Sequence, residues 1–128
     1  MLDLVAEMTG GRRTPVDAVR THRAKAYVLD HLQDQGLTAD AVARAVGVTT
    51  RHLNRGFVAE GTTVTQFIQR QRLERARRDL VLRPAATDRI GDVASRWCFA
   101  SQAHFNRLFR TAYGCTPTQY RSEHSGRV

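Results

Sequence analysis

The chain has 128 residues, enough for one ordinary domain or two very small ones, and its apolar content is normal for a globular protein. A formal charge of +8, a sequence pI near 10.9 and far more arginine than lysine suit a polyanionic partner, either nucleic acid or an anionic membrane surface. Two cysteines are too few for a disulfide framework, and no apolar run is long enough to span a membrane. The N-terminus also lacks a signal-peptide layout, so we expect a cytoplasmic protein of a bacterial type.

Residues 1–16 are interpreted as a linker or as the remnant of a preceding region. A mildly apolar stretch ends at Glu7, and the glycine- and proline-containing run that follows, residues 9–15, is typical of a linker. One hypothesis is that the chain is the C-terminal part of a longer protein. An ordinary frayed N-terminus explains the layout about as well.

Residues 17–63 are predicted to form a first subdomain of three helices. In the first helix, apolar and aromatic residues recur at i, i+3, i+4, i+7 and i+8 from Ala24, which marks one buried face of a helix that ends before Gly36. A second, short helix is expected between an N-cap at Thr38 and a stop at Gly47.

The third helix of this subdomain is expected to follow a threonine cap, at Thr49 or Thr50. A longer linker helix is predicted over residues 64–83. It ends there because the residue before Pro84 avoids helical geometry.

Residues 84–124 are predicted to form a second subdomain with the same order of elements. Asp88 is expected to cap one helix and Ser101 the next, which Gly114 ends, and Thr116-Pro117 opens the last helix. No segment alternates apolar and polar residues with period two, so the predicted fold class is all-α.

The two predicted subdomains share a repeated sequence. Leu53 to Phe67 reads LNRGFVAEGTTVTQF, and Phe105 to Tyr120 reads FNRLFRTAYGCTPTQY. In both copies a short helix and a tight turn precede a capped helix, and two helices joined in this way form a helix-turn-helix unit, whose second helix can enter a DNA major groove. The turn is one residue longer in the second copy, which indicates two divergent units and not a solenoid.

Polar residues share the outer face of the second helix in each unit. They are Arg51, Asn54 and Arg55 in the first copy and Gln102, Ala103, His104 and Arg107 in the second. Arginine can bind guanine bidentately, and asparagine and glutamine can bind adenine in the same way. The hydroxyls of Thr50 and Ser101, with the free N–H groups of helix N-termini, suit phosphate oxygens. Singly, such residues are ordinary solvated faces of amphipathic helices; as two matched helices in a chain of charge +8, they predict DNA binding.

Other functional classes lack their residues. The sequence shows no Ser-His-Asp order, carboxylate pair or glycine-rich phosphate loop, and no histidine is paired with another ligand at i, i+4, so we expect no catalysis, no metal and no cofactor. Cys98 and Cys115 flank a helix of about 20 Å, too long for a disulfide to span, and are expected to be free, small, buried thiols. We expect no membrane partner, although a membrane surface remains the competing explanation of the basic charge.

These motifs resemble the DNA-binding domain of the AraC/XylS family of bacterial transcription regulators, over about Thr21 to Arg121. The more specific signature is Ile90-x-x-Val93-Ala94, Phe99-Ala100-Ser101-Gln102-Ala103-His104-Phe105, Arg107-x-Phe109 and Tyr113-Gly114-x-Thr116-Pro117-x-x-Tyr120-Arg121. The first motif is similar to Val42-Ala43-x-x-Val46-Gly47-Val48-Thr49-x-Arg51-His52-Leu53-x-Arg55-x-Phe57, and the linker helix to Arg72-Leu73-x-x-Ala76-Arg77-x-x-Leu80.

The resemblance implies seven helices in two helix-turn-helix subdomains joined by a long central helix, and a sequence-specific transcription regulator that places two recognition helices in successive major grooves. The base-facing positions it implies are Arg51, Asn54 and Arg55 in the first recognition helix and Gln102, Ala103 and Arg107 in the second. Ala103 would offer a methyl contact to thymine, His104 a backbone contact or packing, and Arg121 attraction to phosphate.

The family usually carries a preceding effector-binding and dimerising domain, so we expect a monomer in this form and a dimer only through an absent domain. RNA polymerase is expected as a second partner, beside double-stranded DNA. The alternative is the DNA-binding part of a larger DNA-repair or regulator protein whose activity lies in a missing domain. Two departures from the family pattern stand out: Cys98 replaces a glycine in the second turn, and Gly56 lies inside the first recognition helix.

Overall fold

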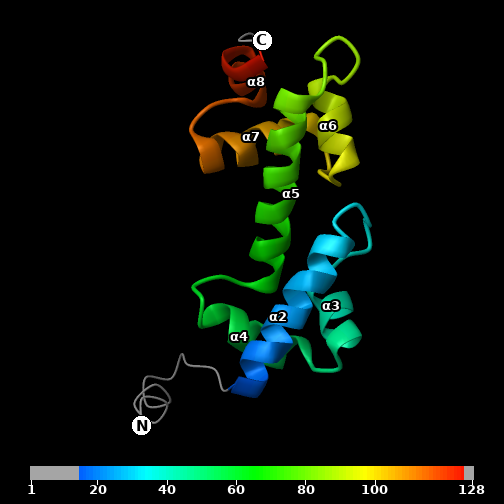
Figure 1. The fold of residues 1–128 in the computed structure, drawn as a ribbon, viewed down its shortest axis with the longest axis vertical. Helices are drawn as coiled ribbons and strands as arrows, with labels where there is room; N and C mark the ends of the chain where they lie inside the picture. The colour runs from blue at the N-terminus through cyan, green and yellow to red at the C-terminus, as the bar shows by residue number, and fades with distance from the viewer. Residues whose placement is uncertain (1–14, 126–128) are drawn as a thin grey trace. The chain divides into compact units, whose positions relative to one another are not determined.

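The computed structural model describes residues 15–125, and this part of the chain forms seven helices and no strand (Figure 1). The helices are α2 (Pro15–Asp30), α3 (Ala39–Val46), α4 (Thr50–Val58), α5 (Val64–Leu82), α6 (Ile90–Arg96), α7 (Gln102–Tyr113) and α8 (Pro117–Ser125). The predicted all-α class is confirmed. Of the linker or remnant predicted at residues 1–16, only residues 15 and 16 are described, and they belong to the first turn of α2.

The helices fall into two compact units that divide within α5, between Gln69 and Arg70. The first unit holds α2, α3, α4 and the start of α5, and the second holds the rest of α5 with α6, α7 and α8. The predicted boundaries at residues 63 and 83 stay a prediction. In the described part of the chain no helix is long and apolar enough to span a membrane.

The core of the first unit forms where α2, α3 and α4 meet. Its buried apolar side chains are Ala24, Val28, Leu32, Leu37, Val42, Ala43, Leu53, Phe57, Val64 and Ile68. The helix α2 ends at Asp30, earlier than the predicted stop before Gly36. The chain tightens there because the His31 N–H bonds Val28 O, and Asp34 then accepts from the Gly36 N–H, so a side chain competes with continued helix. Leu32 still lies in the core.

Helices α2 and α4 approach closely at Gly56. A Cβ atom added there would overlap Thr21 Oγ1 and would lie 3.6 Å from Thr21 Cβ. Thr21 is 2% exposed, and its hydroxyl donates to Asp17 O at 2.9 Å, within α2. Glycine inside α4 therefore has a packing cause that outweighs its low helix propensity.

The core of the second unit is aromatic. Its buried apolar side chains are Leu73, Ala76, Leu80, Val93, Ala94, Trp97, Phe105 and Phe109. Phe109 packs edge-on against Phe105 and Tyr120, with ring centroids 5.6 and 5.7 Å apart, which is a favourable aromatic geometry. The Trp97 indole N–H donates to Asp79 Oδ2 at 2.8 Å, so the polar edge of this large side chain is also satisfied.

Asp88 was predicted to cap α6, and this prediction is wrong. Asp88 is 4% exposed and its carboxylate pairs with the guanidinium of Arg96, which also bonds Asp79. The N-cap of α6 is Arg89, whose backbone N–H donates to Asp92 Oδ2 at 3.0 Å. A buried carboxylate gains more from a charged hydrogen-bonding partner than from one backbone amide.

The other predicted caps are confirmed. The hydroxyls of Thr38, Thr49 and Ser101 each accept a hydrogen bond from the backbone N–H of the third residue of the helix that follows. Of the two candidates for α4, Thr49 is the cap, and Thr50 instead donates its hydroxyl to Asp40. Cys98 and Cys115 form no disulfide, as predicted, but both are half-buried and not buried.

Candidate nucleic-acid interface

The turns between α3 and α4 and between α6 and α7 begin with the same backbone construction, although the second turn is one residue longer, counted from its left-handed residue to the N-cap of the next helix. Gly47 and Cys98 both adopt left-handed φ angles, +81° and +67°. The next residue in each turn bonds back to the preceding helix: Val48 N to Ala43 O at 3.0 Å, and Phe99 N to Ala94 O at 2.9 Å. This pattern is a Schellman motif, and it folds the chain sharply enough to place α4 and α7 as second helices of two helix-turn-helix units.

The inner faces of α4 and α7 anchor these recognition helices. Leu53 and Phe57 are buried on α4, and Phe105 and Phe109 on α7, at the i, i+4 spacing that holds one side of a helix against a core. The opposite sides are therefore left at the surface.

The exposed residues on these outer sides include most of the predicted set. Arg51, Arg55, Ser101, Gln102, Ala103 and Arg107 are exposed, whereas Thr50, Asn54 and His104 are half-buried. Among the described residues, neither Arg51 nor Arg55 has a carboxylate partner. An arginine without an internal partner can exchange water for a base edge or a phosphate at small cost.

The His104 side chain is half-buried and contacts neighbouring residues of the second unit. Its ring lies 6.5 Å from that of Phe99, and its Nδ1 faces Arg107 Nη2 at 3.4 Å. This contact within one turn of α7 favours a role in placing the Arg107 guanidinium.

Arg121 does not join this surface. It is 7% exposed, its Nε–H donates to Leu80 O at 3.0 Å, and its Nη1 donates to Asp88 O at 2.6 Å. Its guanidinium closes the C-terminal end of α5, where helix carbonyls lack partners. The predicted phosphate role of Arg121 is corrected accordingly, because its donors are directed into the second unit.

Arg110 is a surface arginine that is not among the predicted DNA-contacting residues. It is exposed and lies three residues after Arg107, on the same side of α7. The spacing alone could have identified it, because residues at i and i+3 are neighbours on a helix surface.

A hydrogen-bonded cluster fixes the C-terminal end of α7. The Tyr113 hydroxyl donates to Glu74 Oε1 at 3.0 Å, and Arg77 bonds both Glu74 and the Tyr120 hydroxyl. Hydrogen bonding from Arg77 lowers the pKa of Glu74 below its ordinary value, although burial opposes it. Burial, aided by the Glu74 carboxylate, raises the pKa of Tyr113 to about 12, so this hydroxyl stays a donor at neutral pH.

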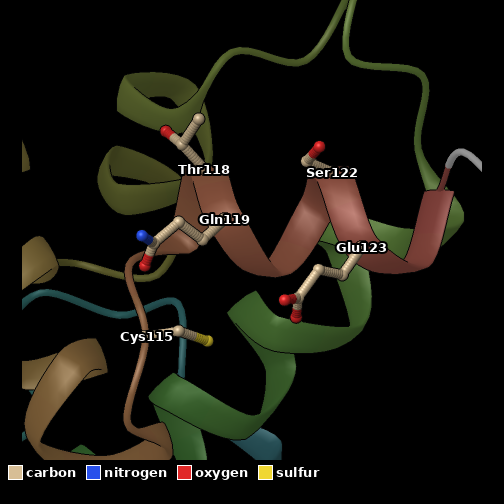
Figure 2. Close-up of a pocket in the computed structure, with 5 residues that line it drawn as sticks. All are labelled: Cys115, Thr118, Gln119, Ser122 and Glu123. Atoms are coloured by element: carbon tan, nitrogen blue, oxygen red, sulfur yellow. The ribbon is translucent and has the colours of Figure 1, made fainter.

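A shallow pocket on the second unit has a different character (Figure 2). It is lined by Cys115, Thr118, Gln119, Ser122 and Glu123, a neutral to acidic set that does not suit a phosphate. Within residues 15–125 no group of three or more His, Cys, Asp or Glu side chains could hold a metal ion.

Comparison with known proteins agrees with this architecture. A family model described as "Helix-turn-helix domain" matches residues 42–123. The transcriptional activator NphR of a Rhodococcus species is 35% identical over 103 residues, which are 80% of this chain, and the chain spans only 30% of the length of NphR.

Two solved structures show the same fold. One is a transcriptional regulator from Chromobacterium violaceum, described as containing an AraC-type DNA-binding domain, with a TM-score of 0.78 and 24% identity, covering 90% of this chain and all of that one. The other is the DNA-binding domain of AdpA in complex with a target DNA, with a TM-score of 0.74 and 25% identity, covering 84% of this chain and 94% of that one. The family model covers more than half of the chain, and the two helix-turn-helix units of the chain carry the predicted motifs. The chain therefore belongs to the AraC/XylS family of DNA-binding transcription regulators.

Proposed function

We propose that this chain binds duplex DNA sequence-specifically as a monomer, with α4 and α7 in successive major grooves. The observation that supports it most directly is the pair of matched recognition helices, each buried on its apolar side and exposed on a polar, largely cationic side. Recognition helices contact base edges mainly with residues of their first turns, which is where these exposed side chains begin.

Base discrimination is assigned to four long side chains: Arg51, Arg55, Gln102 and Arg107. The exposed Ala103 contributes a methyl contact, which suits the 5-methyl group of thymine. Each good bidentate pair between a side chain and a base edge contributes about 1–3 kcal/mol of discrimination.

Phosphate contacts are assigned to the N-terminal ends of the recognition helices. Ser101 and Thr50 lie there, beside backbone N–H groups that carry the positive end of the helix dipole. To donate to a phosphate, the Thr50 hydroxyl would have to exchange its bond to Asp40 for the new one. His104 supports Arg107, and Arg110 adds attraction to the backbone further along α7.

The wider setting of this activity follows from the family. We propose a cytoplasmic location, RNA polymerase as a second partner, and dimers only where a further domain supplies them. No catalytic role is proposed for this part. The competing proposal, a DNA-binding part of a larger repair protein, is favoured by no specific contact in the described residues.

Replacing Arg107 with alanine tests the assignment. We expect Arg107→Ala to flatten the base preference at one or two adjacent positions of sites selected from random duplex DNA, because a single guanidinium contacts a single step of the groove. The control is Arg23→Ala, which removes another exposed charge, on α2, and should leave the base preference intact. An equal loss of affinity for all sequences in Arg107→Ala would contradict base reading by α7.

A further inference from the structure

Asn54 and Asn106 occupy the same position in the two copies of the repeat, yet their side chains have different partners. In the first unit, Asn54 Oδ1 accepts a hydrogen bond from the backbone N–H of Val64 at 2.9 Å. In the second, Asn106 Oδ1 is buried and has no hydrogen-bond partner among the described residues.

The cause lies in one residue at the start of the following helix. Aligning the repeats places Val64, the first residue of α5, opposite Pro117, the first residue of α8. Proline has no backbone N–H and is favoured at this helix position, so the second copy lacks the donor that Asn54 uses.

The two helix starts share one pair of reciprocal bonds, so the first residue of each helix can be compared within the same local motif. Before α5, the Thr63 N–H donates to Gln66 Oε1 and the Gln66 N–H donates to Thr63 Oγ1, both at 3.1 Å. Before α8, Thr116 and Gln119 make the same two bonds, at 2.9 and 3.1 Å. Each pair is a capping box, and it leaves the N–H of the first helical residue without an acceptor of its own.

In α5 that acceptor is a side chain of the recognition helix. Val64 is fully buried, so water cannot take the place of Asn54, and a buried backbone N–H without a partner is costly. The bond therefore joins the middle of α4 to the first turn of α5 inside the first unit.

We infer that Asn54 is a positioning residue, which sets α4 against the start of α5, and that the second unit lacks the equivalent bond because Pro117 has no N–H to donate. This inference rests on the proposed function in taking α4 as a recognition helix. It replaces the predicted base-reading role of Asn54, because the carbonyl that would pair with adenine already accepts the Val64 N–H.

A double-mutant cycle tests the bond itself, in the full chain. Val64→Pro removes the donor, and its other effect, the replacement of a buried valine side chain, is common to both backgrounds and cancels in the cycle. Pro117 shows that proline is accepted at this position of the repeat. Asn54→Ala should lower the folding equilibrium constant about 5- to 150-fold in the native background, because it leaves a buried N–H without a partner, and much less in the Val64→Pro background. Equal losses in both backgrounds, measured by urea unfolding, would overturn the inference.

A second arm separates positioning from base reading. Asn54→Asp keeps the oxygen that accepts from Val64 but loses the amide donors, so it should fold like the native chain. Its added negative charge should weaken binding to all duplexes by a similar factor, without changing base preference at any position. A lost preference at one base pair, with the others retained, would show that Asn54 reads a base.

The two failures are distinguishable. A native chain without any sequence preference would contradict the proposed function, while the unfolding cycle would still report on the Asn54 to Val64 bond. The reciprocal substitution, Pro117→Val, supplies an N–H for Asn106 Oδ1, so its effect on the folding equilibrium constant should be more favourable when Asn106 is present than in an Asn106→Ala background. An equal effect of Pro117→Val in the two backgrounds would overturn the explanation for the second unit.

Discussion

At the scale of single residues, the turn between α6 and α7 contains backbone strain that the turn between α3 and α4 lacks. Cys98 holds a φ angle of +67°, where a side chain crowds the backbone, and Gly47 holds the same place in the first unit without a side chain. We expect Cys98→Gly to stabilise the fold by up to about 1 kcal/mol, the relieved strain being partly offset by the greater freedom of glycine when unfolded.

The reverse change supplies the control for this prediction. A Cβ at Gly47 would meet no atom within 4 Å, so Gly47→Cys should destabilise through backbone strain alone. Urea unfolding of both variants checks the pair. A destabilised Cys98→Gly would mean that contacts of the half-buried thiol outweigh the strain.

Gly56 allows a second residue-level prediction. Gly56→Ala should destabilise by about 1–3 kcal/mol, because the new methyl group overlaps Thr21 Oγ1. In a Thr21→Ala background the nearest remaining atom of that residue is Cβ at 3.6 Å, an ordinary contact, so the same change should then be neutral or stabilising by about 1 kcal/mol.

Thr21→Ser is the matched background for this experiment, because serine keeps the offending oxygen and should keep the penalty. Thermal unfolding of the three pairs gives the comparison. If Gly56→Ala costs the same in the alanine and serine backgrounds, the contact with Thr21 is not the reason for the glycine.

Residue roles that depend on distant partners could not be predicted from the sequence. Asp88 has the right type and place for a helix cap, but its partner Arg96 is brought close only by the folded second unit. Arg121 was predicted to be a surface charge, but Leu80 O accepts from its Nε–H, Asp88 O accepts from its Nη1, and its Nη2 is buried without a partner among the described residues. The local signals of Thr38, Ser101 and Gly114, by contrast, act within a few residues and were predicted correctly.

At the scale of helices, the order was predictable, and so were the bounds that have a local signal: α3, α4 and α7 begin after a threonine or serine cap, α3 and α7 end at a glycine, and α5 ends just before Arg83-Pro84. The end of α2 was not predictable from periodicity, since Leu32 continues the apolar pattern after the helix has stopped at Asp30. The exposed faces of α4 and α7 followed from the same spacing that identified their buried faces.

The cluster that ties α7 to α5 predicts a pH dependence. The pKa of Glu74 is lowered in the folded chain by Arg77, so its stabilisation is present above the ordinary value near 4.5 and is lost as pH falls through the folded pKa. Glu74→Gln should therefore reduce the fall in unfolding free energy below about pH 4.5.

Urea unfolding between pH 3 and pH 7 measures this effect. Asp30→Asn, at the exposed C-terminal end of α2, controls for the loss of one negative charge. If the unfolding free energy falls as steeply at acid pH in Glu74→Gln as in the native chain, Glu74 does not contribute to that fall.

At the scale of the whole molecule, charge and duplication carry the functional argument. A net charge of +8 indicates a polyanionic partner. Because the two recognition helices differ in their exposed residues, we expect them to recognise different base sequences, which predicts an asymmetric DNA site. Composition could not identify which arginines stay at the surface, because Arg96 and Arg121 differ from Arg51 and Arg107 only in the folded units.

Methylation interference on DNA sites selected by the native chain, at one chain per duplex, tests the central claim most directly. The predicted result is two tracts of major-groove interference with different sequences, centred about one helical turn apart on one face of the duplex. A single tract, or a palindromic site occupied by two chains, would contradict the account.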